Sequence, residues 1–532
     1  MNTKQIRRYE SNNAMVSSGR KEATDIGIQI FKKGGNAIDA AVAVGFAMGV
    51  AEPATSGLGG GGFMTINLPG NSESIFIDFR ENAPKSAYPD MWCLDEKGKV
   101  IDKANAIGAK SISVPGEVAG LIYVLENYGT MTLEEVMAPT IKLAEEGIVV
   151  TAMLENMLGI YGKHLEKCES AKDIYCKDFK EGDLLRNKKI ANTLKTIAFE
   201  GRDVFYKGKI SKEIIKSVQD MGGLLTKEDL EEYEVEVKEP VVGEYRGYTI
   251  ISSPPPSSGG THIIQSLNIL ENFDIGSLEV NSAEYLHMFS EAFKLSYEDR
   301  AKFMADTKFI DVPLKGLRSK KYAKVLSKKI DLNTARKPEC YDPWNYEHDD
   351  TTHYSIGDKE GYLVSVTKTI NHFFGSCMVG GNTGILLNDT MADFSTNKYD
   401  VNSVDSRKKP LSSMSPTLIL KDGKPVAIIG SPGGVRIINV IVQIISKIVD
   451  HGMDIQEAIE SPRITQNATN TMLYENRISS KVIEDLKAMG HDMNQCLDYD
   501  KKMGGVNGIY YTEDGKIIGA ADPRRDGVAY GI

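Results

Sequence analysis

The sequence predicts an α+β fold in which stacked sheets are covered by outer helices. Two observations lead to this fold class. Up to about residue 304, several long stretches have helical periodicity. Beyond Thr351, short β-prone segments joined by tight turns replace them. Mixed helices and antiparallel hairpins are typical of layered domains.

The N-terminal part supplies most of the predicted helices. Residues 23–33 have helical periodicity that stops at Gly34-Gly35, and residues 37–50 form an almost wholly apolar, buried helix. The glycine run 57–62 then precedes a strand at 63–68. Further helices are expected at about 115–128, 132–146, 187–199 and 282–304. Residues 315–350 are polar and are expected to form an exposed, mostly irregular linker, with one short helix beginning at Ser319.

Two hairpins are predicted beyond Thr351. A turn at 358–361 joins strands at 353–356 and 363–370, and antiparallel pairing then places Thr351 opposite Lys368 or Thr369. That arrangement allows the Thr369 hydroxyl to hold the Thr351 hydroxyl, although an ordinary cross-strand threonine pair satisfies the register equally well. A second turn at 421–424 joins strands at 417–420 and 425–429, and its register predicts Ser412 opposite Gly433. A long helix should follow at about 436–450.

Composition excludes several classes of function. The chain has 532 residues, 41% of them apolar and 26% charged, as in ordinary globular proteins. A net charge of −10 argues against a nucleic-acid or anionic-membrane surface. The six scattered cysteines form no Cys-x-x-Cys pair, and no histidine cluster has metal-ligand spacing, so neither a metal nor another cofactor is expected. Residues 1–20 lack the apolar region of a secretory signal, which predicts a cytoplasmic protein unless a signal has been removed.

Residues 351–355 read Thr-Thr-His-Tyr-Ser and contain the candidate nucleophile. A threonine hydroxyl needs an adjacent base, and the α-amine of Thr351 itself, with an ordinary pKa of ~7.7–8.0, would serve. That amine is free only if the Asp350–Thr351 bond is cut. The alternative, favoured by composition alone, is a plain β-prone strand start.

Gly433 and Gly434 lie between a predicted strand and a predicted helix. Their N–H groups and the positive end of the helix could together stabilise an oxyanion. A simple strand-to-helix turn is the alternative.

Several ordered motifs resemble those of one family. They are Gly34-Gly-Asn-Ala-Ile-Asp-Ala-Ala41, Ser56-Gly-Leu-Gly-Gly60, Asp78-Phe-Arg-Glu-Asn-Ala-Pro84, Thr351-Thr-His-Tyr-Ser355, Thr369-Ile-Asn371, Asp393-Phe-Ser395, Pro410-Leu-Ser-Ser-Met-Ser-Pro416 and Gly430-Ser-Pro-Gly-Gly434. In this order they resemble the γ-glutamyltransferase family, also called γ-glutamyltranspeptidases or glutathione hydrolases, which are N-terminal-nucleophile hydrolases. The resemblance spans nearly the whole chain.

The resemblance implies a four-layer αββα sandwich and a precursor that cleaves itself. Thr351 would attack the Asp350 carbonyl, and the resulting ester would be hydrolysed. The products would be a large subunit, 1–350, and a small catalytic subunit, 351–532. They would remain associated as a heterodimer in one intertwined αββα domain.

The resemblance also implies the chemistry of the mature enzyme. Thr351 would take the γ-glutamyl group of a glutathione-like amide as an ester and pass it to water or to an amino acid or peptide amine. Gly433 and Gly434 would stabilise the oxyanion. Arg80, Ser412 and Ser413 would bind the α-carboxylate of the substrate. Asn371 and Asp393 would bind its α-ammonium.

Two departures from the family pattern widen the range of substrates considered. Thr390 stands where many relatives have Gln or Glu contacting the substrate amine, which would weaken that contact. The polar segment 396–409 is shorter than the lid loop of relatives and predicts an open site. The alternatives are therefore a lidless, capsule-depolymerase-like poly-γ-glutamate hydrolase or transpeptidase, and a β-lactam side-chain acylase.

Two other classes of function receive little support. Residues 57–62 match Gly-x-Gly-x-x-Gly, but a β-prone segment follows where a dinucleotide-binding fingerprint needs a helix. A non-catalytic, uncleaved relative is the other class. The presence of Thr351, Thr369, Asn371, Gly433 and Gly434 argues against it.

Overall fold

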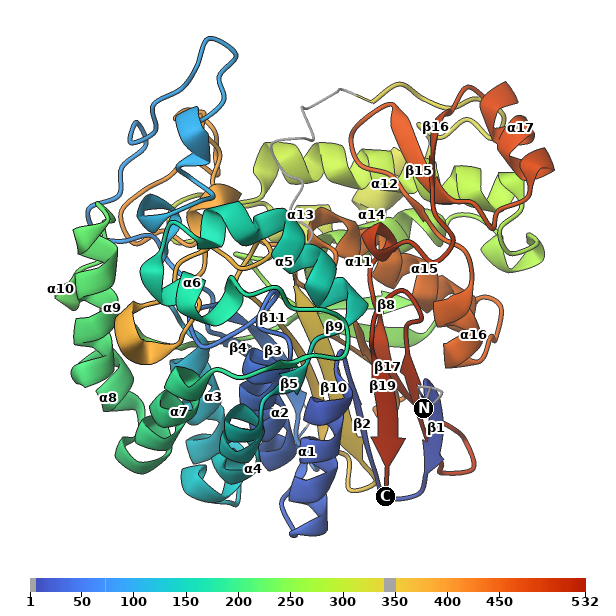
Figure 1. Ribbon diagram of the computed structural model, residues 1–532. Helices are drawn as coiled ribbons and strands as arrows, with labels where there is room; N and C mark the ends of the chain where they lie inside the picture. Colours follow the sequence, from blue (N-terminus) through green and yellow to red (C-terminus); the bar gives the residue numbers. More distant parts are fainter. Residues whose placement is uncertain (1–5, 72, 339–350) are drawn as a thin grey trace.

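Two stacked seven-stranded sheets form the centre of the computed structural model, which describes residues 6–71, 73–338 and 351–532 (Figure 1). The first sheet has the order β19-β2-β10-β11-β3-β4-β7. Its strands are β19 (Val528–Gly531), β2 (Ala14–Ser18), β10 (Thr352–Asp358), β11 (Leu363–Thr369), β3 (Gly61–Asn67), β4 (Ile75–Asp78) and β7 (Glu236–Lys238).

The second sheet has the order β1-β18-β17-β13-β12-β9-β8. Its strands are β1 (Arg8–Ser11), β18 (Ile517–Ala521), β17 (Asn507–Tyr511), β13 (Lys424–Gly430), β12 (Thr417–Lys421), β9 (Tyr248–Ser252) and β8 (Val241–Tyr245). Strands of both sheets contribute to one apolar cluster that includes Met15, Leu363, Leu418 and Ile428. These side chains pack the sheets against each other.

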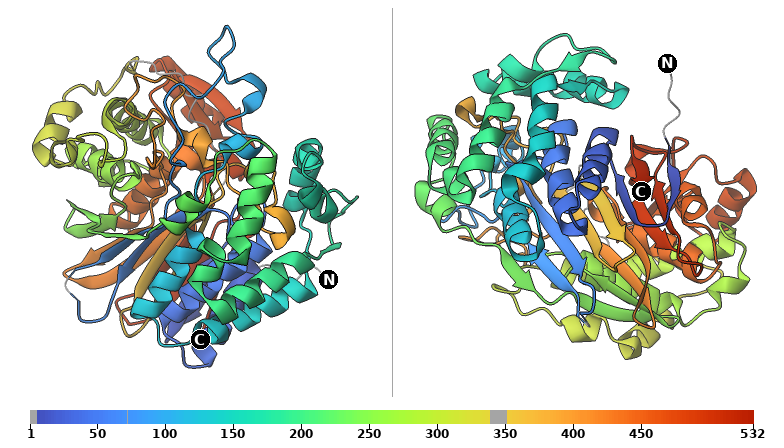
Figure 2. Two further views of the ribbon diagram at one scale, coloured as in Figure 1. Left: turned by 90° about the vertical axis from the view of Figure 1, so that its left-hand side faces the viewer. Right: turned by 90° about the horizontal axis from the view of Figure 1, so that it is seen from below.

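Helices cover both outer faces, as Figure 2 shows. On the first sheet lie α1 (Lys21–Lys32), α2 (Ala37–Ala51) and α3 (Glu117–Tyr128), with α4 (Leu133–Glu146) packed against α1 and α2. On the second lie α11 (Gly259–Leu270) and α15 (Ile437–Val449), with α12 (Ala283–Phe303) packed against α11. Asn36 caps α2, accepting from the N–H groups of Ile38 and Asp39, and nearly every residue of this helix is buried. The predicted αββα sandwich is confirmed.

The remaining elements lie at the margins of the sandwich. The helices are α5 (Ala152–Leu165), α6 (Glu169–Tyr175), α7 (Lys188–Glu200), α8 (Arg202–Tyr206), α9 (Lys209–Asp220), α10 (Lys227–Glu231), α13 (Leu314–Leu317), α14 (Lys320–Ser327), α16 (Ile455–Glu460) and α17 (Ser480–Ala488). Two small sheets pair β14 (Ile464–Thr465) with β15 (Thr471–Glu475) and β16 (Asp492–Cys496), and β5 (Ile148–Val149) with β6 (Leu184–Leu185).

The predicted linker at 315–350 is only partly irregular. Ser319 caps α14 as expected, accepting from Lys321 N at 3.2 Å. Ala323 and Leu326 on this helix are nevertheless buried in the apolar core, where the helix packs against α11, so the prediction of exposure is wrong there. Residues 339–350 lie outside the described residues.

The register of the first hairpin is confirmed. Thr352 pairs with Lys368, which brings Thr351 to the level of Thr369. The predicted register of the second hairpin is wrong beyond the paired part of β12 and β13, which ends at Thr417 and Ile429. Ser412 instead bridges to Ser257, because the proline-flanked segment 410–416 leaves β12 and runs beside the segment before α11.

The sheets interleave strands from either side of residue 350. In the first sheet, β10 and β11 lie between β2 and β3. In the second, β9 pairs with β12. Among the described residues, no helix is long and apolar enough to cross a membrane.

Candidate active site

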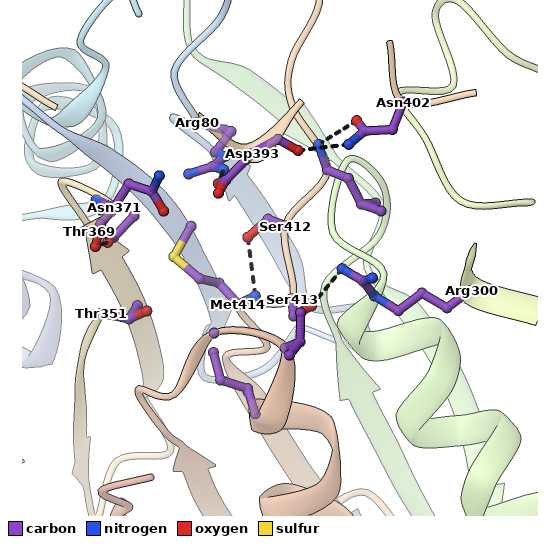
Figure 3. A pocket seen from close by; sticks show the side chains of 14 residues that line it. Arg80, Arg300, Thr351, Thr369, Asn371, Asp393, Asn402, Ser412, Ser413 and Met414 are labelled. Carbon is purple, nitrogen blue, oxygen red and sulfur yellow. Dashed lines mark hydrogen bonds and ion pairs between the residues drawn. The ribbon is translucent and has the colours of Figure 1, made fainter. Parts of the chain in front are cut away.

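One pocket gathers most of the predicted site residues. It encloses about 510 Å³, including its open mouth. Its lining includes, in chain order, Arg80, Thr351, Thr369, Asn371, Asp393, Ser412, Ser413 and Gly434, all of which the sequence singled out. Figure 3 shows the side chains of these residues, other than glycine, converging from strands and loops far apart in the chain.

Thr351 and Thr369 lie on one side of the pocket, 5% and 4% exposed. The chain bends sharply after β11 because Asn371 has a left-handed φ of 76°. Asn371 N donates to the Thr369 hydroxyl at 2.8 Å, and its side-chain amide donates to the Asp389 carbonyl at 3.2 Å. These bonds hold Thr369 and Asn371 beside Thr351.

His353 points away from this pocket and lies between the sheets. Its ring nitrogens lie 2.9 Å from the Thr367 hydroxyl and 3.0 Å from the Ser355 hydroxyl. A Cβ at Gly430 would approach the ring to 2.2 Å, so only glycine fits there. Burial lowers the pKa of His353 to about 3, and the ring is therefore neutral.

A buried ion pair lies on the other face of β10 and β11. The Lys368 ammonium donates to a Glu117 carboxylate oxygen and, at 2.6 Å, to the Gly45 carbonyl. Both charged side chains are fully buried. Burial raises the pKa of Glu117 to about 7, although Lys368 opposes the shift. This pair fixes β11 next to Thr369.

Arg80 is the central cation of the pocket and is 1% exposed. Its guanidinium donates to Glu81 at 3.2 Å and to Asp393. Its backbone N–H donates to Asp78 at 2.9 Å, and Lys238 donates to the same carboxylate at 2.6 Å. The site therefore already holds a guanidinium between two carboxylates, a charge pattern complementary to a zwitterion.

Asn388 and Asn402 position the loop that carries Asp393. The Asn388 side chain donates to the carbonyls of Gly59 and Ser113, at 2.7 and 2.9 Å. The Asn402 amide donates to the Asp393 carbonyl at 2.7 Å. Its own carbonyl accepts from Leu411 N at 3.0 Å. The short segment 396–409 thus ties Asp393 to the serine segment.

Thr390, expected to contact the substrate amine, is not among the residues that line the pocket. Its hydroxyl donates to Glu81 Oε1 at 3.0 Å and is fully buried. The residue begins a short 3-10 turn, 390–393, whose geometry directs the hydroxyl toward Glu81. Thr390 therefore acts on Arg80 through Glu81.

Ser412 and Ser413 face the pocket opposite the threonines. Ser412 Oγ accepts from Met414 N at 3.2 Å. Arg300, near the end of α12, donates to Ser413 Oγ at 3.1 Å. Sequence reasoning missed Arg300, Asn402 and Met414 as lining residues. Arg300 lies in a helix that the pattern did predict, but periodicity alone does not show which charged residue of a helix faces a cavity.

Gly433 and Gly434 connect β13 to α15. Their φ angles, 134° and 54°, are strained for any other residue. A short 3-10 turn at 434–436 then leads directly into α15. Gly434 lines the pocket, whereas Gly433 lies one residue behind it. The predicted cleavage partner Asp350 lies outside the described residues.

Outside this pocket, His287, Glu291 and His491 offer ligand atoms within 4.8 Å of one another. Such a group could hold a metal ion. The spacing of these residues along the sequence did not indicate the cluster, because His491 lies far along the chain from His287 and Glu291. Lys294, however, donates to Glu291 at 2.7 Å, and His287 Nδ1 lies 2.8 Å from His491 Nε2. The adjacent ammonium disfavours a further cation here.

Known proteins resemble this chain over nearly its whole length. The family model described as Gamma-glutamyltranspeptidase matches residues 23–532. A glutathione hydrolase proenzyme from Escherichia coli (strain K12) is 42% identical over 96% of this chain and 90% of that protein. An acylase ACY 1 proenzyme from Pseudomonas sp. (strain SE83) is 38% identical over 97% of this chain and 93% of that protein.

Among solved structures, a cephalosporin acylase from Bacillus halodurans superposes with a TM-score of 0.89 at 26% identity. The match covers 98% of this chain and 96% of that one.

Proposed function

The chain belongs to the gamma-glutamyltranspeptidase family, and from this membership we propose that it is a self-cleaving γ-glutamyltransferase and glutathione hydrolase. The observation that supports the proposal most is the shared pocket of Thr351, Thr369, Arg80 and Asp393. A threonine, a guanidinium and a carboxylate in one cavity suit an acyl donor that carries a free amino-acid head.

Self-cleavage is the first step of the proposal. The Thr351 hydroxyl attacks the Asp350 carbonyl, the peptide shifts to an ester, and water hydrolyses that ester. Residues 1–350 and 351–532 become separate chains, and Thr351 gains a free α-amine. The interleaved strands keep the two chains together.

In the mature reaction, Thr351 supplies both the base and the nucleophile. Its α-amine removes the hydroxyl proton as the oxygen attacks the γ-carbonyl of the donor. The N–H groups of Gly433 and Gly434 stabilise the oxyanion, the leaving amine takes the proton, and a γ-glutamyl ester remains. Water then yields glutamate, or a second amine yields a new γ-glutamyl amide.

The ion pair between Arg80 and Asp393 supports recognition of the α-amino and α-carboxylate groups of the donor. In this structure Asp393 pairs with Arg80. An α-carboxylate, assisted by Ser412 and Ser413, would take the place of Asp393 on the guanidinium. Asp393 and Asn371 would then accept the α-ammonium. This exchange of ion pairs selects for substrates that carry both charges.

Two measurements test the proposal. On a denaturing gel, the purified protein should give two bands that match 1–350 and 351–532, and Thr351→Ala should give one. A donor panel should include glutathione, glutamine and a poly-γ-glutamate, with and without glycylglycine, and should be followed for glutamate and for γ-glutamyl product. A cleaved protein that turns over no γ-glutamyl donor would exclude this function.

Acylase activity is the second candidate. It is favoured by the likeness to a solved cephalosporin acylase and to an acylase proenzyme. An acylase would use the same threonine and oxyanion groups, but its substrate would not need an α-ammonium. Adding a glutaryl amide, which lacks the ammonium, to the panel separates the two activities.

A further inference from the structure

Arg300 is a second arginine in the pocket, and the mechanism above does not use it. It belongs to the last turn of α12 and is 7% exposed. Figure 3 shows Arg80 and Arg300 entering the pocket from different sides, with Arg300 beside Ser413. The pocket thus contains two guanidinium groups.

Arg300 hydrogen-bonds Ser413 directly and is linked to Ser412 through Ser258. Its Nη2 donates to Ser413 Oγ at 3.1 Å, and its Nε donates to Ser258 Oγ at 2.9 Å. Ser258 then donates its hydroxyl proton to the Ser412 carbonyl at 2.9 Å, and its backbone N–H donates to the same oxygen at 2.8 Å. The guanidinium therefore helps to position Ser413 directly and Ser412 through Ser258.

The chemistry of arginine also determines the direction of these bonds. A guanidinium has five N–H donors and no acceptor, so Ser413 Oγ must accept from it. The Ser413 proton is then left for another acceptor. Ser258 Oγ, 3.4 Å away, is a distant one. A carboxylate in the pocket would be a closer and charged acceptor, which makes it the stronger partner.

We propose that Arg300 is a positioning residue that turns Ser413 into a hydrogen-bond donor for the donor substrate's α-carboxylate. Through Ser258 it also holds Ser412 in place. The inference rests on the proposed γ-glutamyl function, because it assigns part of the same pocket. It adds that the requirement for a free α-carboxylate depends on two arginines, one in contact with the substrate and one acting through the serines.

The test compares two chromogenic donors that differ in one group. L-γ-Glutamyl-p-nitroanilide carries the α-carboxylate, and 4-aminobutyryl-p-nitroanilide lacks it but keeps the amine and the reacting amide. Arg300→Met should raise KM for the first donor roughly tenfold or more, as expected for a lost charge-assisted bond. It should leave kcat for that donor and kcat/KM for the second within about twofold.

A double-mutant cycle separates positioning from a merely structural role. In a Ser413→Ala background, Arg300→Met should add less than about threefold to KM, since its direct bond to the Ser413 hydroxyl is already lost and only its indirect hold on Ser412 remains. Arg300→Lys should restore part of the affinity. Arg318→Met is the matched control, because Arg318 also donates to two oxygens, the carbonyls of Leu314 and Val242, but does not line the pocket.

The outcomes distinguish this inference from the function on which it rests. A wild-type protein inactive on both donors would overturn the two together. If the wild type is active and Arg300→Met impairs both donors equally, only the role of Arg300 is refuted. If Arg300→Met does not fold, Ser258→Ala and Arg300→Gln replace it, and both should show the same donor-selective rise in KM.

Discussion

Replacing Lys368 with methionine should destabilise the protein strongly, by an amount that depends on pH. The change keeps the length of the side chain but removes the ammonium that Glu117 and the Gly45 carbonyl accept. Both charged groups are fully buried, and removing one partner of such a pair costs about 3–5 kcal/mol. Since proteins are commonly stable by about 5–15 kcal/mol, the loss should be obvious.

The pH dependence follows from the raised pKa of Glu117. Burial raises this pKa from 4.5 to about 7, so the folded carboxyl binds its proton more tightly than the unfolded one. The contribution of this group to stability is complete below its unfolded pKa and is lost as the pH rises through about 7. Lys368→Met should therefore cost most above that pH. At about pH 6, where Glu117 is neutral, the cost should fall to about 1–3 kcal/mol for the lost hydrogen bonds.

Urea unfolding followed by circular dichroism measures the effect, in a Thr351→Ala background where a single uncut chain is expected. Adding Glu117→Gln to Lys368→Met should recover part of the loss, because no buried charge remains. Lys21→Met is the control, since Lys21 forms an exposed ion pair with Asp25 that should contribute less than about 0.5 kcal/mol. A loss of stability below about 1 kcal/mol above pH 7, or one that is the same above pH 7 and at about pH 6, would refute the reasoning.

Three further predictions concern the pocket itself. Thr369→Val removes the hydroxyl that accepts from Asn371 N, so it should lower kcat for γ-glutamyl transfer by at least about tenfold and cost about 1–3 kcal/mol of stability. Steady-state kinetics and urea unfolding measure the two effects, and an unchanged kcat would contradict a role for Thr369 beside Thr351. Asp393→Asn should raise KM about tenfold or more for γ-glutamyl-p-nitroanilide but not for the glutaryl analogue without the amine; equal effects would remove Asp393 from ammonium binding. Thr390→Val leaves Glu81 Oε1 without its donor and should lower the urea midpoint while changing KM by less than about threefold; a larger KM effect would restore Thr390 as a direct substrate contact.

Patterns within neighbouring residues were predictable from the sequence. The β10–β11 register followed from one turn and placed Thr351 beside Thr369. The helix at 37–50 was evident because it is apolar on every side, and the structure buries it on every side. In both cases local chemistry and tertiary packing require the same arrangement.

Contacts between distant segments were not predictable in this way. Ser412 was placed opposite Gly433 by extending a hairpin register, but the chain leaves that hairpin and pairs with Ser257, a partner that no local pattern indicates. Thr390 lies in the expected motif, yet its hydroxyl faces Glu81 because the turn at 390–393 directs it inward. Arg300 reaches the pocket from a predicted helix, but the sequence pattern of that helix does not show which of its charged residues faces a cavity.

The interleaving of strands around residue 350 changes what unfolding means for this molecule. Strands β10 and β11 lie between β2 and β3, and each pair is joined by main-chain hydrogen bonds. Before cleavage, unfolding involves one chain, and its midpoint is independent of protein concentration. After cleavage, the same transition releases two chains, so dilution should lower the melting temperature. A single cut peptide bond would thus convert a folding equilibrium into an assembly equilibrium while every strand keeps its neighbours.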